Sequence, residues 1–155
     1  MDHTVVYFVE TNTEEQLLAL CKWVDRFYEE GKKVQIVASS SAAAQHLDHL
    51  LWTFAQGSFI PHRFCPSPES ASGIERVVIT LEETPVKGAT VLISDSPVGL
   101  DFMVHYDHVV HFVLLDNPEK RQLSRSVWQT ARERGLQINH IAYAPKGKRF
   151  PSREE

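Results

Sequence analysis

The chain has 155 residues, of which 43% are hydrophobic and 23% are charged, and its formal net charge at pH 7 is −4. A domain of this size buries roughly 70% of its unfolded surface, so the length fits one domain with a substantial core. The N-terminal residues lack the basic segment of a signal peptide, and no apolar stretch approaches the ~20 residues of a membrane-spanning helix. Cys21 and Cys65 form no C-x-x-C pair, so we expect reduced thiols in a cytoplasmic protein.

The first half of the chain predicts two strands, each followed by a helix. TVVYFVE (4–10) and KVQIVA (33–38) are rich in β-branched residues and predict strands. TEEQ (13–16) predicts a capping box, and apolar residues then repeat at helical spacing until Gly31. Serines at 39–41 open the second helix. At 100° per residue its buried face comprises Ala43, Ala44, Leu47, Leu50, Leu51 and Phe54.

Trp52 falls on the opposite, polar side of that second helix, beside Asp48 and His49. Phe59 follows the helix just after Gly57 and could extend the same surface. Displayed aromatic residues mark protein–protein hot spots, so we expect a docking surface here. The alternative is that later strands cover Trp52 and make it part of the core.

The second half predicts strands over 75–82, 89–95 and 108–115, then a helix and a closing strand over 136–143. Asp116 or Asn117 is expected to cap this helix, which runs to about Arg134. The alternation predicts an α/β fold: a Rossmann-like three-layer sandwich with a mixed, mostly parallel sheet and helices on both faces. We expect a single domain over 1–143, followed by a basic, disordered tail over 144–155.

The sequence offers no site for a nucleotide, a metal or a small-molecule substrate. The turn after the first strand, ETNTEE, lacks glycines, and no P-loop motif occurs, so we expect no nucleotide-binding loop and no cofactor. His105, His108 and His111 point in different directions on a strand, and His46 and His49 lack further ligands. Asp95 ends a predicted strand without an acid–base partner, so we expect it to cap a loop.

The C-terminal quarter is basic and carries a regular cationic stripe. From Asn117 onward there are nine lysines and arginines against four acidic residues, which indicates an acidic partner. The last helix places four residues on one stripe and predicts that Leu123, Val127 and Thr130 face the sheet. The arginine–tryptophan stripe consists of Arg121, Arg125, Trp128 and Arg132. It suits a carboxylate ligand with an apolar group, or single-stranded nucleic acid; otherwise it is a solvated helix face.

Two segments carry a resemblance to a known family. GKKVQIVASSSAAAQHLDHLLWTFAQGSFIPH and VVHFVLLDNPEKRQLSRSVWQTARERGLQINH are similar to the chi subunit of bacterial DNA polymerase III holoenzyme, and the likeness extends to about Tyr143. The resemblance implies a noncatalytic accessory subunit that acts in DNA replication in the bacterial cytoplasm, at the nucleoid-associated replisome. It implies no cofactor and mainly indirect contact with DNA.

The resemblance also implies two partners. The family's contacts with the psi subunit of the clamp loader fall on Trp52 and Phe59. Its contacts with the acidic, phenylalanine-ended tail of single-stranded-DNA-binding protein fall on Arg125 and Trp128. Gln129 stands where the family usually has a lysine, and three cations are positioned to compensate: Lys120, Arg121 and Arg132. The alternatives are a direct single-stranded-nucleic-acid binder and a small-molecule enzyme of Rossmann type.

Overall fold

A computed structural model describes residues 3–54, 60–67 and 73–144. Its strands form one seven-stranded sheet in the order β3-β4-β2-β5-β6-β1-β7, and every described strand pair is parallel. The strands are β1 (Val5–Thr11), β2 (Val34–Val37), β3 (Arg63–Phe64), β4 (Val77–Thr80), β5 (Val91–Ser94), β6 (His108–Leu114) and β7 (Gln137–Ile141). The helices are α1 (Gln16–Glu29), α2 (Ser41–Thr53), α3 (Leu100–Met103) and α4 (Pro118–Glu133).

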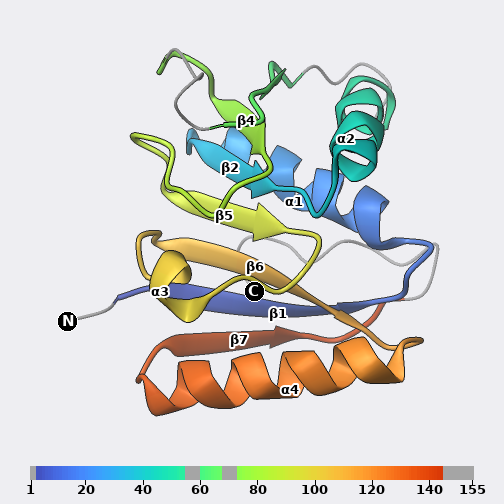
Figure 1. The fold of residues 1–155 in the computed structure, drawn as a ribbon, viewed down its shortest axis with the longest axis vertical. Coiled ribbons are helices and arrows are strands. Elements are labelled where there is room, and N and C mark those ends of the chain that lie inside the picture. Colours follow the sequence, from blue (N-terminus) through green and yellow to red (C-terminus); the bar gives the residue numbers. More distant parts are fainter. Residues whose placement is uncertain (1–2, 55–59, 68–72, 145–155) are drawn as a thin grey trace.

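Helices cover both faces of the sheet, which confirms the predicted α/β sandwich (Figure 1). The sheet is parallel throughout the described residues, with no antiparallel strand to make it mixed. The fully buried strands read VQIV, VVIT and VLIS, which are the nearly continuous apolar runs typical of a parallel sheet covered on two faces. The short elements β3 and α3 were not predicted, because two or four residues are too few to show a period.

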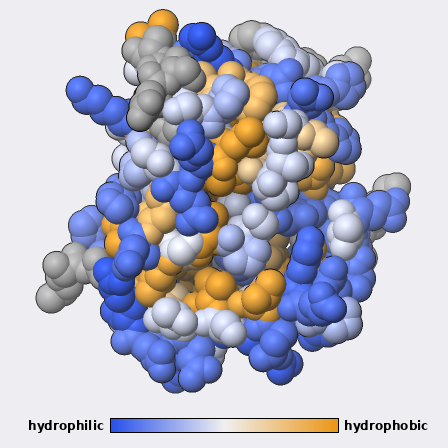
Figure 2. Space-filling model, viewed as in Figure 1, coloured by the Kyte–Doolittle hydropathy of each residue, from blue (hydrophilic) through white to orange (hydrophobic). Residues whose placement is uncertain are grey.

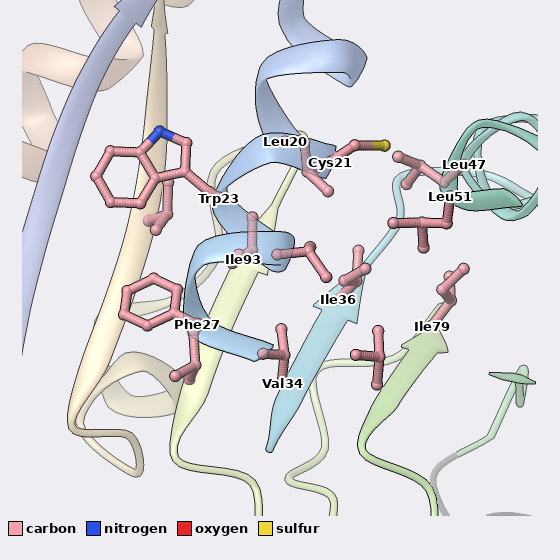
Figure 3. Packing of buried hydrophobic residues seen from close by; sticks show 14 of the residues in the cluster. Leu20, Cys21, Trp23, Phe27, Val34, Ile36, Leu47, Leu51, Ile79 and Ile93 are labelled. Atoms are coloured by element: carbon pink, nitrogen blue, oxygen red, sulfur yellow. The ribbon is translucent and has the colours of Figure 1, made fainter. Parts of the chain in front are cut away.

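The face beneath α1 and α2 holds a large apolar core. Figure 3 shows side chains of α1 and α2 converging on the central strands. Trp23, which the sequence pattern did not assign to the core, is only 1% exposed. Its ring lies 6.0 Å from that of Phe27 and 5.4 Å from that of Tyr7. The Arg26 guanidinium lies 5.0 Å from the Trp23 ring centroid and makes a cation–π contact with this aromatic cluster.

The start of α1 differs from the prediction, whereas the start of α2 agrees with it. The N-cap residue of α1 is Glu15, whose side chain makes no capping hydrogen bond, so the predicted capping box is wrong. The Glu15 N–H instead donates to Asn12 Oδ1 at 2.8 Å. The Thr13 hydroxyl instead donates to Asp116 at 3.0 Å, which ties the end of β1 to the end of β6. In α2 the Ser40 side chain accepts from the Ala43 N–H, and in α4 Asn117 accepts from the Lys120 N–H. The hydroxyl of Thr13 thus contributes to the tertiary structure rather than to the local helix.

The orientation of α4 corrects part of a second prediction: Val127 is half-buried and packs against the core as expected, but its two predicted companions do not. Leu123 is 52% exposed and Thr130 is also exposed, whereas the small residues Ser124 and Ala131 are buried against the sheet. The reason is a buried polar pair: the Ser124 hydroxyl lies 2.8 Å from His111 Nε2 on β6. Because Ser124 and His111 form a hydrogen bond with each other, neither buried polar group lacks a partner. The small side chains of Ser124 and Ala131 then allow α4 to lie close to the strands.

Figure 2 shows the α3–α4 face of the molecule, with a largely hydrophilic rim and apolar surface exposed between the two helices. A groove of about 160 Å³ is lined there by Val98, Leu100, Ser126, Val127 and Thr130. The flank of α4 that was predicted to be buried therefore borders this groove. None of the helices in the described residues has the length and apolar character needed to cross a bilayer. Phe59 and the predicted tail after Ala144 lie outside the described residues.

Candidate interaction surfaces

Trp52 is displayed on the outer side of α2, as the helical angles predict. It is 49% exposed, while Ala44, Leu47 and Leu51 of the same helix are buried. The neighbouring His49 is exposed as well. The alternative in which later strands cover Trp52 is therefore wrong.

His62, which the sequence pattern did not single out, supports the inner side of the Trp52 ring. The two ring centroids lie 4.7 Å apart, and the His62 side chain is itself fully buried. Its Nδ1 lies 2.8 Å from the Ile60 carbonyl oxygen, and its Nε2 lies 2.9 Å from an Asp48 carboxylate oxygen. These contacts hold His62 between α2 and the segment before β3, so one side of the Trp52 indole packs against a side chain that is fixed in position.

The arginine–tryptophan stripe lies on the flank of α4 that faces β7. All three of its arginines are exposed, and Trp128 is 39% exposed. The Arg132 guanidinium lies 5.2 Å from the centroid of the Trp128 ring, close enough for a cation–π contact. Gln129 is exposed but is not among the residues that line the adjoining pocket. The predicted stripe is thus a continuous surface, and Gln129 lies outside it.

A shallow pocket of about 180 Å³ adjoins this stripe. Its lining comprises Phe8, Glu10, Val113, Leu115, Arg121, Ser124, Arg125, Trp128 and His140. The pocket thus offers guanidinium groups, an indole face and an apolar floor within one site. These groups suit a ligand that combines carboxylates with an apolar side chain.

Glu10 is the one carboxylate among these lining residues, and two hydrogen-bond partners hold it in place. It lies 2.9 Å from His140 Nε2 and accepts a hydrogen bond from the Tyr143 N–H at 3.0 Å. Burial would raise the pKa of Glu10, but the hydrogen bonds from Tyr143 and His140 outweigh burial, so the pKa is lowered. Arg121 adds a further lowering influence. Glu10 therefore stays ionised in this pocket, and the attraction for an acidic ligand comes from the neighbouring Arg121 and Arg125.

The remaining polar candidates have structural contacts. The Asp95 carboxylate accepts hydrogen bonds from the Ser39 N–H and hydroxyl, both at 2.9 Å, so it caps a loop as expected. His111 pairs with Ser124, and His108 Nδ1 lies 3.2 Å from the Tyr7 hydroxyl. In the described part of the chain, no three His, Cys, Asp or Glu side chains gather as a metal site would require.

Comparison with known proteins gives a consistent set of relatives. The family model described as "DNA polymerase III chi subunit, HolC" matches residues 3–139. DNA polymerase III subunit chi of Pseudomonas aeruginosa is 26% identical over 123 residues, which cover 79% of this chain and 83% of the relative. DNA polymerase III subunit chi of Escherichia coli is 26% identical over 147 residues, covering 90% of this chain and 97% of the relative.

Proposed function

Because the chain belongs to the DNA polymerase III chi subunit family, we propose that it is an adaptor with two docking surfaces. As a member of this family it is a noncatalytic accessory subunit of DNA polymerase III and takes part in DNA replication. In the proposal, the Trp52 surface binds the psi subunit of the clamp loader, with Phe59 as a second contact. The arginine–tryptophan stripe binds the acidic tail of single-stranded-DNA-binding protein. The adaptor would act in the cytoplasm, at the replisome on the nucleoid.

The observation that carries this proposal is the separation of the two surfaces. Figure 1 shows α2 and α4 at opposite ends of the long axis of the molecule, and they cover opposite faces of the sheet. Each carries an exposed tryptophan, at 49% for Trp52 and 39% for Trp128. An adaptor needs two such surfaces that do not compete for space.

The stripe can be tested with two arginines, one within α4 and one at its C-cap. Arg125 lines the pocket, whereas Arg134 lies on the other flank of α4 and pairs with Asp101 at 3.1 Å. Arg125→Ala should weaken an acidic, phenylalanine-ended peptide tenfold or more, because a charge-assisted hydrogen bond contributes about 1.5–3 kcal/mol. Arg134→Ala removes the same charge and should change the affinity less than about twofold. If isothermal titration gave the same loss of peptide affinity for both variants, binding would depend on the net charge of the protein and not on the stripe.

The Trp52 surface is tested by titrating purified psi subunit. Trp52→Ala should weaken binding by about 2 kcal/mol or more, as truncation of a hot-spot residue does. His46→Ala, an exposed substitution on the same helix about 120° around from Trp52, is the matched control and should leave the affinity unchanged. The stripe also allows a test of the alternative function. If Arg125→Ala weakened binding of single-stranded DNA and the peptide did not bind at all, the chain would be a direct single-stranded-nucleic-acid binder instead.

A further inference from the structure

The stripe runs beside a strand edge that no other described strand covers. β7 is the last strand of the sheet, and among the described residues only β1 pairs with it. In a parallel sheet, alternate residues of such an edge strand direct their N–H and C=O groups outward. Free edges of this kind bind extended peptides by adding them to the sheet as a further strand.

The stripe and the strand edge are close to each other and similar in length. His140 of β7 lines the same pocket as Arg125 and Trp128, and Figure 1 shows α4 lying along β7. From Arg121 to Arg132 the helix rises by about 16 Å at 1.5 Å per residue. The five residues of β7 extend over about 13 Å from first to last at 3.3 Å per residue. A peptide that follows β7 would therefore stay beside the cations over the whole length of the strand.

The spacing of side chains along an extended peptide is also similar to the spacing of residues along the stripe. In an extended peptide, side chains on one face recur every second residue, at about 6.7 Å. Along α4 the steps from Arg121 to Arg125 and from Trp128 to Arg132 are about 6 Å, and the step between these two pairs is about 4.5 Å. The steps of the stripe are thus somewhat shorter than the peptide repeat. Every second side chain of an extended peptide can still meet one member of the stripe. The intervening side chains point to the opposite face of the sheet, away from α4.

We propose that the acidic peptide binds as an additional strand on the outer edge of β7, with every second side chain directed at the arginine–tryptophan stripe. This inference rests on the proposed function, because it concerns the same acidic partner. The main-chain hydrogen bonds hold the peptide extended, and the stripe selects carboxylates at alternate positions. The apolar end of the peptide packs on Trp128 and the pocket floor.

The experiment uses the full-length chain and the synthetic acidic peptide, with two independent readouts. In amide hydrogen exchange at saturating peptide, alternate amides of β7 should slow roughly tenfold or more as they gain strand partners. Amides of β3, the strand at the opposite edge of the sheet, should not change. In the second readout, peptides carry an N-methyl group at a single backbone amide, which removes one donor and blocks close approach of the strands.

The N-methyl series should show a period of two. Methylation of the amides that face β7 should weaken binding tenfold or more, and methylation of the intervening amides less than about threefold. Alanine replacement of the acidic side chains should also alternate between strong and weak effects. A uniform response to methylation together with unchanged β7 exchange would overturn strand addition, while an intact Arg125 dependence would leave the proposed function standing. Absence of any peptide binding would overturn both.

Discussion

The three tryptophans of the chain lie in three environments that the type of residue alone does not distinguish. Trp23 is enclosed by Tyr7 and Phe27, Trp52 rests with one side on His62, and Trp128 stands beside Arg132. An enclosed aromatic side chain buries a large area, so the stability lost when the ring is removed shows how far the ring is buried. The difference in exposure between Trp23 and Trp52 therefore becomes a difference in stability.

We expect Trp23→Ala to lower the free energy of unfolding by about 3–5 kcal/mol, because it leaves a large cavity in the core. Trp52→Ala should cost no more than about 1 kcal/mol, since half of its surface is exposed to solvent. Urea unfolding of the two variants, followed by circular dichroism, measures both values. A loss of 3 kcal/mol or more for Trp52→Ala, by the same cavity scale, would show that Trp52 belongs to the core and is not a docking residue.

His111 makes stability depend on pH. Burial lowers the pKa of His111 to about 4, well below the value of about 6.5 in an unfolded chain. Between these two values the unfolded state binds the proton and the folded state does not, so stability falls as pH falls. The contribution is fully present above pH 6.5 and should drop by about 2 kcal/mol between pH 7 and pH 5.

Chemical unfolding at pH 7 and pH 5 tests this dependence on His111. His111→Gln retains a side-chain partner for Ser124 but does not titrate, so it should remove most of the difference between the two pH values. The exposed His46→Gln is the control and should leave the difference as it is in the wild type. An unchanged pH dependence in His111→Gln would assign the effect to other groups.

At the scale of elements, α2 and α4 show why the same angular reasoning succeeds for one helix and fails for the other. In α2 the large apolar residues are the ones that pack, so their angles locate the buried face. In α4 the contact is made by Ser124 and Ala131, whereas the larger Leu123 is exposed. A serine that pairs with a buried histidine on another element has no signature in the local sequence.

The packing of α4 predicts opposite responses at two positions. Ala131→Leu should lower the free energy of unfolding by about 1–3 kcal/mol, because it adds volume at a close helix–sheet contact. Leu123→Ala removes a larger side chain but should change stability by no more than about 0.5 kcal/mol, since the residue is exposed. Thermal or urea unfolding measures both. A larger loss for Leu123→Ala than for Ala131→Leu would mean that α4 is turned toward the originally expected face.

Much of the fold follows from the sequence, but the partners within the candidate site do not. The apolar runs were sufficient to predict the α/β class. The helical periods were sufficient to predict that Trp52 and the arginine–tryptophan stripe are exposed. Glu10 and His140 contribute to the same pocket only because β1 and β7 pair in a register that aligns Phe8 with His140. Such a register depends on packing across the whole sheet, and local patterns do not report it. His62 was missed for the same reason, because its contact with the Trp52 ring is a tertiary contact.

For the whole molecule, the arrangement predicts that the two proposed docking surfaces act independently. Figure 1 shows α2 and α4 at opposite ends of the molecule, with the parallel sheet between them. Buried apolar clusters pack on both faces of the sheet, so we expect it not to switch between two arrangements that ligands could select. Coupling between two sites requires such a two-state element, which both ligands bias.

We therefore expect the affinity for the acidic peptide to change less than about twofold when psi is bound, which is a coupling free energy below about 0.4 kcal/mol. Isothermal titration of the peptide into the chain alone and into its complex with psi measures this ratio. Trp52→Ala in the free chain should also leave peptide affinity unchanged, because its ring contacts His62 and not α4. A change of fivefold or more on psi binding would show that the sheet transmits a conformational change between its two ends. Mutually exclusive binding would mean that the two partners share one surface.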